Sequence, residues 1–180
     1  MSGVRRHQRL GWGIAGFSGP TVVSHPHLFA CELTWTGASE GPIRSYETYS
    51  RAYRVDFEGK PPLEGSSSPA FRGDGARHNP EDLLVAALSS CHCLSYLALC
   101  ARRGVRVVAY SDSARGRMEA VGGVIRFTEV VLRPIVTVLE GTDDALAGAL
   151  HDEAHASCFI ASSVNFPVTH DATLLFPRGS

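Results

Sequence analysis

The fold of this chain is decided by one stretch, NPEDLLVAALSSCHCLSYLALCARRG at residues 79–104. Asn79 can cap a helix, Pro80 suits the first helical position, and the two carboxylates that follow favour the positive end of the helix dipole. Two arginines followed by Gly104 are typical of a helix end. Between these signals the stretch holds no Lys, Arg, Asp or Glu, and His92 is its one histidine. It therefore predicts a central buried helix of about 24 residues.

Strand-like segments flank this helix on both sides. They are rich in Val, Tyr, Phe and Thr and cover residues 28–35, 46–57, 105–109, 115–120, 124–139 and 164–175. Gly122-Gly123 is expected to form a hairpin turn. A second helix is expected from Thr142 through His155, followed by a short helical piece after Cys158. This order predicts an α+β domain with mainly antiparallel pairing.

The two ends of the chain stand apart from this domain. Residues 1–27 form an arginine- and glycine-rich N-terminal extension, the domain covers residues 28–175, and residues 176–180 are a short tail. Inside the domain, residues 58–78 are rich in Pro, Gly and Ser and predict a long loop. Loops of this length are usually lids or binding loops.

The composition excludes several classes of protein. The chain has 180 residues, 44% of them apolar and 19% charged, which suits one globular domain. A net charge of −1 leaves no electrostatic footprint for nucleic acid. No run approaches the 18 or more apolar residues of a membrane helix. We therefore expect a cytoplasmic protein that binds neither nucleic acid nor membranes.

The five cysteines do not indicate a secreted disulfide scaffold, which would be shorter and richer in cysteine. Cys91 and Cys93 lie on opposite faces of the long helix and cannot cooperate there. The positive end of the helix is eleven residues from Cys91 and too far away to stabilise a thiolate. A reactive Cys91 would need a cation from elsewhere in the fold, and the alternative for each helix cysteine is inert packing.

Residues 79–91 resemble the hallmark of the OsmC/Ohr family (osmotically inducible protein C and organic hydroperoxide resistance protein). That hallmark reads Asn-Pro-Glu-x-Leu, then Ala-Ala, then Cys. The second family motif is a cysteine at the end of the next helix, usually after an Ala-His pair, and Ala154-His155-Ala156-Ser157-Cys158 is similar to it. The resemblance extends from about residue 29 to residue 173. One departure is Phe159, where many relatives have proline.

The resemblance implies an OsmC-like fold, with mainly antiparallel sheets wrapped around long central helices in an intertwined homodimer. It also implies a thiol peroxidase, in which the Cys91 thiolate attacks a small-molecule hydroperoxide and becomes a sulfenic acid. Cys158 would then form a disulfide with Cys91, and an external dithiol, lipoyl or thioredoxin-like, would reduce it. This chemistry needs no cofactor and no metal.

In the family an arginine activates the thiolate, and a glutamate orients that arginine. Glu81 occupies the family's glutamate position. Two arginines are candidates: Arg51 in the first strand region is our first choice and Arg72 in the long loop is the second, with a solvated surface charge as the alternative for each. We expect Leu63 and Phe71 of the long loop to line a pocket that favours organic hydroperoxides.

Two other functions remain open. His151, His155 and Cys158 share one helical face at a spacing that could bind zinc, although two histidines on an exposed helix face are more often only solvated. Alternatively, the chain could be a binding protein that has this fold without peroxidase turnover.

Overall fold

The computed structural model describes residues 26–176 of the chain. The chain divides into two units between Ala30 and Cys31, and the helices and strands of the described residues all belong to the second. The predicted tail lies outside the described residues except for Phe176, and the predicted extension lies outside them except for two residues.

Helix α1 covers Pro80–Arg103, which confirms both predicted ends. The Asn79 side chain accepts a hydrogen bond from the backbone N–H of Asp82 at 2.8 Å. Gly104 ends the helix with a φ of 73°, in the left-handed region that glycine adopts without strain.

The prediction that α1 is buried all round is wrong for a single chain. One stripe of the helix is buried, and it consists of Leu88, His92, Tyr96 and Cys100. Most of the other side chains are only partly covered, and Leu94 is 68% exposed. The reason is that one chain supplies packing partners to only one side of the helix.

By length and composition alone, α1 is apolar enough to cross a membrane. The prediction that no segment of the chain reaches this level is therefore wrong. The buried stripe nevertheless includes a histidine and a tyrosine that hydrogen-bond to helix α2, Asp144–Ser157. Such packing is what the core helix of a globular domain shows.

The strands form three three-stranded sheets. The first consists of β1 (Glu32–Trp35), β2 (Tyr53–Asp56) and β3 (Leu63–Gly65). The second has the order β4 (Val107–Asp112), β7 (Pro134–Val138) and β9 (Thr173–Leu175). The third has the order β5 (Arg115–Val121), β6 (Val124–Leu132) and β8 (Val168–His170). Only the pairs β6–β8 and β7–β9 are parallel among the described strands, so the predicted α+β domain with mainly antiparallel sheets is confirmed.

Several segment boundaries differ from the prediction. The long loop contains β3 and a short 3-10 helix, η2, at Pro69–Phe71. The run 124–139 is two strands, because the chain leaves one sheet after Leu132 and enters another at Pro134. The last predicted strand is likewise divided into β8 and β9, which pair in different sheets. The hairpin turn at Gly122-Gly123 is confirmed, since both glycines have positive φ.

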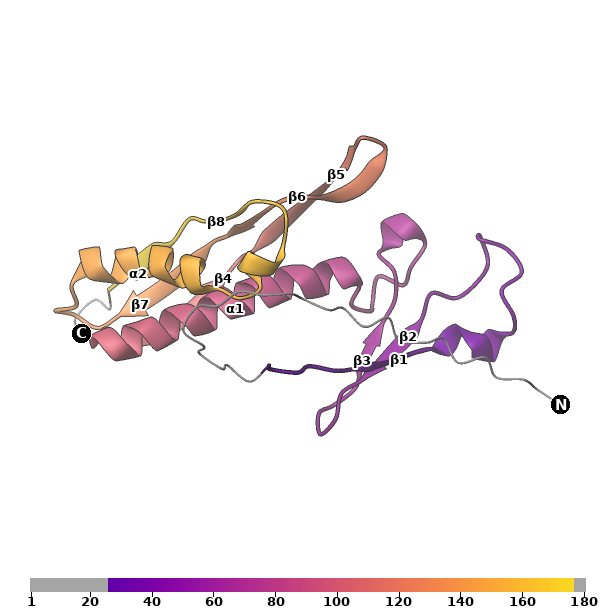
Figure 1. Ribbon diagram of the computed structural model, residues 1–180, viewed down its shortest axis with the longest axis horizontal. Coiled ribbons are helices and arrows are strands. Elements are labelled where there is room, and N and C mark those ends of the chain that lie inside the picture. Colours follow the sequence, from indigo (N-terminus) through magenta and orange to yellow (C-terminus); the bar gives the residue numbers. More distant parts are fainter. Residues whose placement is uncertain (1–25, 177–180) are drawn as a thin grey trace, which may run out of the picture. The chain divides into compact units, whose positions relative to one another are not determined.

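Helix α1 joins two apolar clusters along its length. Toward its C-terminal end, Tyr96 and Cys100 pack with α2 and with Val136 of β7. Nearer its N-terminus, Leu88 packs with Val130 and Leu132 of β6. Figure 1 shows α1 and α2 running alongside these strands. The junction between the two clusters holds residues 91 and 92 of α1, and this is where the candidate site lies.

Candidate active site

Cys91 and Cys158 meet at this junction. Cys91 is half-buried on α1, whereas Cys158 caps the C-terminus of α2 and is 1% exposed. Both are free thiols, and they lie close enough together for the Cys91 thiol to raise the pKa of the Cys158 thiol. The structure thus brings together two cysteines that lie on different helices and 67 residues apart in the sequence.

The turn after α2 holds Cys158 in place. Its carbonyl accepts hydrogen bonds from the backbone N–H and the hydroxyl of Ser162, each at 3.0 Å. The N–H of Ala161 points to the Cys158 sulfur at 3.5 Å. These bonds define the turn and the following 3-10 helix η3, Ala161–Ser163, with Phe159 in the place of the proline of many relatives.

Burial raises the pKa of the Cys158 thiol, and the neighbouring Cys91 thiol raises it further. The Ala161 N–H opposes these effects more weakly. Cys158 is therefore protonated at neutral pH, and a protonated thiol is a poor nucleophile. The accessible member of the pair is Cys91.

The other cysteines do not join this pair. Burial raises the pKa of Cys93, which lies on another side of α1, and also that of Cys100 in the core. Cys31 is exposed and precedes β1 rather than lying in a strand as expected.

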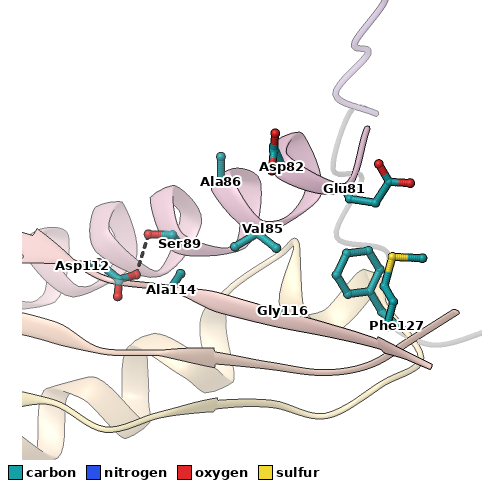
Figure 2. Close-up of a pocket in the computed structure, with 10 residues that line it drawn as sticks. Glu81, Asp82, Val85, Ala86, Ser89, Asp112, Ala114, Gly116 and Phe127 are labelled. Atoms are coloured by element: carbon teal, nitrogen blue, oxygen red, sulfur yellow. Dashed lines mark hydrogen bonds between the residues drawn. The ribbon is translucent and has the colours of Figure 1, made fainter. Parts of the chain in front are cut away.

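Glu81 lies at one end of a cavity of about 540 Å³ between α1 and the strands β4, β5 and β6 (Figure 2). Its Oε2 atom is buried without a hydrogen-bond partner among the described residues. The apolar wall beside it includes Val85, Met118 and Phe127. A Cβ at Gly116 would lie 2.6 Å from the Phe127 ring, so glycine is required for this close approach.

The other end of the cavity is polar. The Ser89 hydroxyl donates to Asp112 at 2.5 Å (Figure 2). The other carboxylate oxygen of Asp112 accepts a hydrogen bond from the backbone N–H of Arg133 at 2.7 Å. These two residues were not predicted, because only the tertiary fold brings β4 beside this part of α1. The loop residues Leu63 and Phe71, which were expected to line a substrate pocket, do not line this cavity.

Arg51 and Arg72 lie together in a second cavity of about 380 Å³. The Arg51 guanidinium donates to the carbonyls of Tyr46 and Tyr49 and lies 3.9 Å from the centroid of the Tyr49 ring. Arg72 is exposed, has a left-handed φ of 64°, and lies 5.8 Å from the Tyr46 ring. Neither arginine forms an ion pair with a carboxylate of the described residues, whereas Arg77 in the same cavity is paired with Glu64 and Asp74.

The parts of the predicted site are separate within one chain. Glu81 and Cys91 are ten residues apart on a continuous helix, which places them about 15 Å apart along its axis. Among the described residues, neither Arg51 nor Arg72 hydrogen-bonds or ion-pairs with Glu81 or Cys91. Of the site residues predicted to act together, only Cys91 and Cys158 are brought together within one chain.

The proposed zinc ligands are not arranged for a metal. No group of three or more His, Cys, Asp or Glu side chains within residues 26–176 could hold a metal ion. The expectation that His151 is solvated is also wrong, because it is 1% exposed and stacks on Tyr96 at 3.8 Å.

Comparisons with known proteins agree with the fold. A family model described as "OsmC-like protein" matches residues 73–173. The chain is similar to the uncharacterized protein YmaD of Bacillus subtilis, with 26% identity over 95 residues, which is 51% of this chain and 63% of YmaD. The match therefore spans less than two thirds of that relative.

Solved structures extend the likeness to most of the chain. An OsmC-like protein of unknown function from Vibrio cholerae, VCA0330, has 31% identity and a TM-score of 0.70, covering 81% of this chain and 99% of its own. An organic hydroperoxide resistance protein from Elizabethkingia anophelis has a TM-score of 0.60 at 18% identity, covering 84% and 99%. OhrB, an organic hydroperoxide resistance protein of Bacillus subtilis, has a TM-score of 0.53 at 16% identity, covering 82% and 98%. At these identities the last two show a shared fold.

Proposed function

This chain belongs to the OsmC-like family, and from that premise we propose that it is a two-cysteine thiol peroxidase that reduces organic hydroperoxides. The observation that carries the proposal is that two free thiols, Cys91 on α1 and Cys158 at the end of α2, are neighbours in the fold. Two neighbouring thiols can form a disulfide with little movement of the backbone. The names of two similar structures, both organic hydroperoxide resistance proteins, support the choice of substrate.

In the first step, the Cys91 thiolate attacks the terminal oxygen of the hydroperoxide. The O–O bond breaks, the alkoxide takes a proton and leaves as an alcohol, and Cys91 becomes a sulfenic acid. Cys158 remains a buried, protonated thiol during this step, so the peroxide reacts with Cys91 first.

In the second step, the sulfur of Cys158 attacks the sulfur of the Cys91 sulfenic acid. The S–S bond forms, the S–O bond breaks, and the hydroxide leaves as water with the proton of Cys158. An external dithiol, lipoyl or thioredoxin-like, then reduces the disulfide. These steps need no cofactor or metal in the protein.

An arginine is needed to stabilise the Cys91 thiolate and the charge that develops on the oxygens. We assign this role to Arg51, with Arg72 as the second choice, and assign Glu81 to orient the arginine. A single chain cannot supply this arrangement, because Glu81 and Cys91 are far apart on one helix. The complete site therefore combines residues of two copies in a homodimer.

The uncovered side of α1 supports a homodimer. Leu94 is 68% exposed on a helix that carries no Lys, Arg, Asp or Glu between its ends. Large apolar surfaces of this kind are usually covered by another protein chain. Glu81 also has a buried oxygen that lacks a partner among the described residues, and an arginine of a second copy would satisfy it.

Hydroperoxide consumption in the presence of a dithiol tests the proposal. Wild-type protein should turn over cumene hydroperoxide faster than hydrogen peroxide, because Val85, Met118 and Phe127 offer an apolar wall beside Glu81. The Cys91→Ser variant should have no turnover, and Cys93→Ser on the same helix should keep it. Full activity in Cys91→Ser would show that the assignment is wrong. A wild-type protein without any turnover would instead support a binding protein on this fold.

A further inference from the structure

Four histidines gather beside the cysteine pair and have no role in the function proposed above. His92 lies on α1, His151 and His155 on α2, and His170 at the end of β8. The ring centroid of His170 is 5.3 Å from that of His92, 5.8 Å from that of His151 and 5.9 Å from that of His155. Two of the four, His92 and His151, are completely buried.

His92 and His151 form a hydrogen-bonded pair between α1 and α2. Nε2 of His92 is 3.1 Å from Nδ1 of His151, and the rings are nearly parallel, with centroids 5.4 Å apart. Tyr96 stacks on His151, with ring centroids 3.8 Å apart. The hydrogen bond requires one nitrogen to donate and the other to accept, so it cannot survive when both rings are protonated.

The surroundings favour neutral rings. Burial, together with the neighbouring histidines, lowers the pKa of both His92 and His151 to about 4. His170 and His155 lower the pKa of His92, and His92 and His170 lower that of His151. Asp112 opposes this effect at His92 and Asp152 opposes it at His151, both more weakly. Asp152 lies 3.2 Å from His170 and is itself largely exposed.

No other buried group of the described residues offers a balancing negative charge. Burial raises the pKa of the Tyr96 and Tyr110 hydroxyls, so both remain neutral. The remaining nitrogens, Nδ1 of His92 and Nε2 of His151, are buried without partners among the described residues. Protonation of the pair would therefore place unbalanced positive charge between the two helices.

The two histidines of the His92–His151 pair lie near Cys91 and Cys158 in the sequence. His92 directly follows Cys91, and Cys158 follows the helix that carries His151. Two other polar links join these helices, the hydrogen bond from the Tyr96 hydroxyl to the Ala147 carbonyl at 3.2 Å and the exposed ion pair of Arg103 with Glu153 at 3.0 Å. Both start further along α1 from Cys91 than His92 does. Separation of α1 from α2 at His92 would move Cys91 away from Cys158.

We propose that the neutral His92–His151 pair positions Cys158 against Cys91, and that acid, by protonating the pair, prevents the two thiols from joining. His92 and His151 are thus positioning residues of the resolving step. The consequence of this inference rests on the proposed function. In acid, Cys158 would not reach the Cys91 sulfenic acid, and a second peroxide would oxidise that sulfenic acid to sulfinic acid.

The direction of the pH effect follows from the lowered pKa values. Both histidines bind protons more weakly in the folded protein than in the unfolded chain, whose ordinary histidine pKa is 6.5. The stability that the neutral pair contributes is present above pH 6.5 and is lost as the pH falls from 6.5 to about 4.

The test uses 4,4′-dithiodipyridine, which reacts in acid and needs no peroxide. Cys91 first displaces one thiopyridone and becomes a mixed disulfide; Cys158 then displaces the second and forms the Cys91–Cys158 disulfide. The other cysteines are replaced in a Cys31→Ser, Cys93→Ser, Cys100→Ala background of the full chain. The rate of the second release, measured from pH 7.5 to pH 4, reports how well Cys158 reaches Cys91.

Loss of the Cys158 thiolate alone lowers this rate about tenfold per pH unit. We expect a fall steeper than this below about pH 5 in the reference protein, where the His92–His151 pair begins to take up protons, and a tenfold fall per pH unit throughout in the His92→Leu, His151→Leu double variant. The control variant His78→Gln, which replaces an exposed histidine, should show the same pH dependence as the reference protein. Equal slopes in the reference and the double variant would overturn the inference.

If the double variant does not fold, proton NMR of the reference protein decides. Two histidine rings must stay neutral to about pH 5, and titration of all histidine rings near pH 6.5 would overturn the inference. Because no peroxide is used, a failed peroxidase assay leaves this result interpretable.

Discussion

Glu81 and Cys91 lie on the same helix, ten residues apart, and cannot meet within one chain. In the site that we propose, they act together through an arginine. The site must therefore take its glutamate from one copy of the chain and its cysteine from another. This requirement makes the homodimer part of the chemistry and leads to a direct genetic test.

Co-expression of Glu81→Gln with Cys91→Ser should restore activity that neither variant has alone. In a heterodimer of the two, one site loses both residues and the other is intact, so a random mixture should recover about a quarter of wild-type activity. Hydroperoxide turnover of the purified mixture measures this. As the matched control, wild type co-expressed with the double variant Glu81→Gln, Cys91→Ser should give heterodimers with no intact site. Activity in those control heterodimers would contradict a shared site.

The activating arginine should be Arg51 rather than Arg72. Arg51 is held by two backbone carbonyls and by the Tyr49 ring, which fixes its guanidinium, whereas Arg72 is exposed. We expect Arg51→Gln to slow oxidation of Cys91 about a hundredfold, as the loss of a fixed charge at a reacting centre does. Stopped-flow rates at neutral pH for Arg51→Gln and Arg72→Gln compare the two candidates directly. The reverse order would assign the role to Arg72.

Cys158→Ser should oxidise once and then fail. Without the buried thiol, Cys91 should consume about one equivalent of hydroperoxide and then proceed to sulfinic acid in excess peroxide. The intact mass of the protein should rise by the corresponding oxygen atoms. Cys100→Ala, which alters a core cysteine that is not part of the pair, should show no such gain. A Cys158→Ser protein that resists over-oxidation would show that another residue resolves Cys91.

The cap of α1 should contribute measurably to stability. Asn79→Ala removes the hydrogen bond to the backbone N–H of Asp82 and should lower the free energy of unfolding by about 1 kcal/mol. Asn79→Asp keeps an accepting oxygen and should retain most of that stability. Urea denaturation of the three proteins measures the difference. An unchanged unfolding midpoint in Asn79→Ala would mean that the cap is energetically unimportant.

Local signals predicted the parts of the fold that depend on neighbouring residues. The ends of α1 follow from Asn79 and Gly104, and the hairpin turn follows from Gly122-Gly123. The break at Pro134 and the division of the last strand were missed, because partner strands from other sheets decide them. Residues 58–78 were expected to be irregular, yet pairing with β2 makes Leu63–Gly65 a strand.

The candidate site was predictable only where a motif marked it. Helical spacing separated Cys91 from Cys93, but its proximity to Cys158 was implied by family resemblance alone. The His92–His151 pair was missed, because it joins residues 59 apart in the sequence. One signal was present: His92 lies four residues from both Leu88 and Tyr96, on what is now the buried stripe. A histidine at that position indicates a polar partner in the core.

The most direct test of the central claim is the mass of the protein after one equivalent of cumene hydroperoxide, without reductant. We predict that each chain loses two hydrogen atoms, and that peptide mapping finds a single disulfide between Cys91 and Cys158. A disulfide that involves Cys31, Cys93 or Cys100 instead, or a Cys91 that remains a free thiol, would contradict the account.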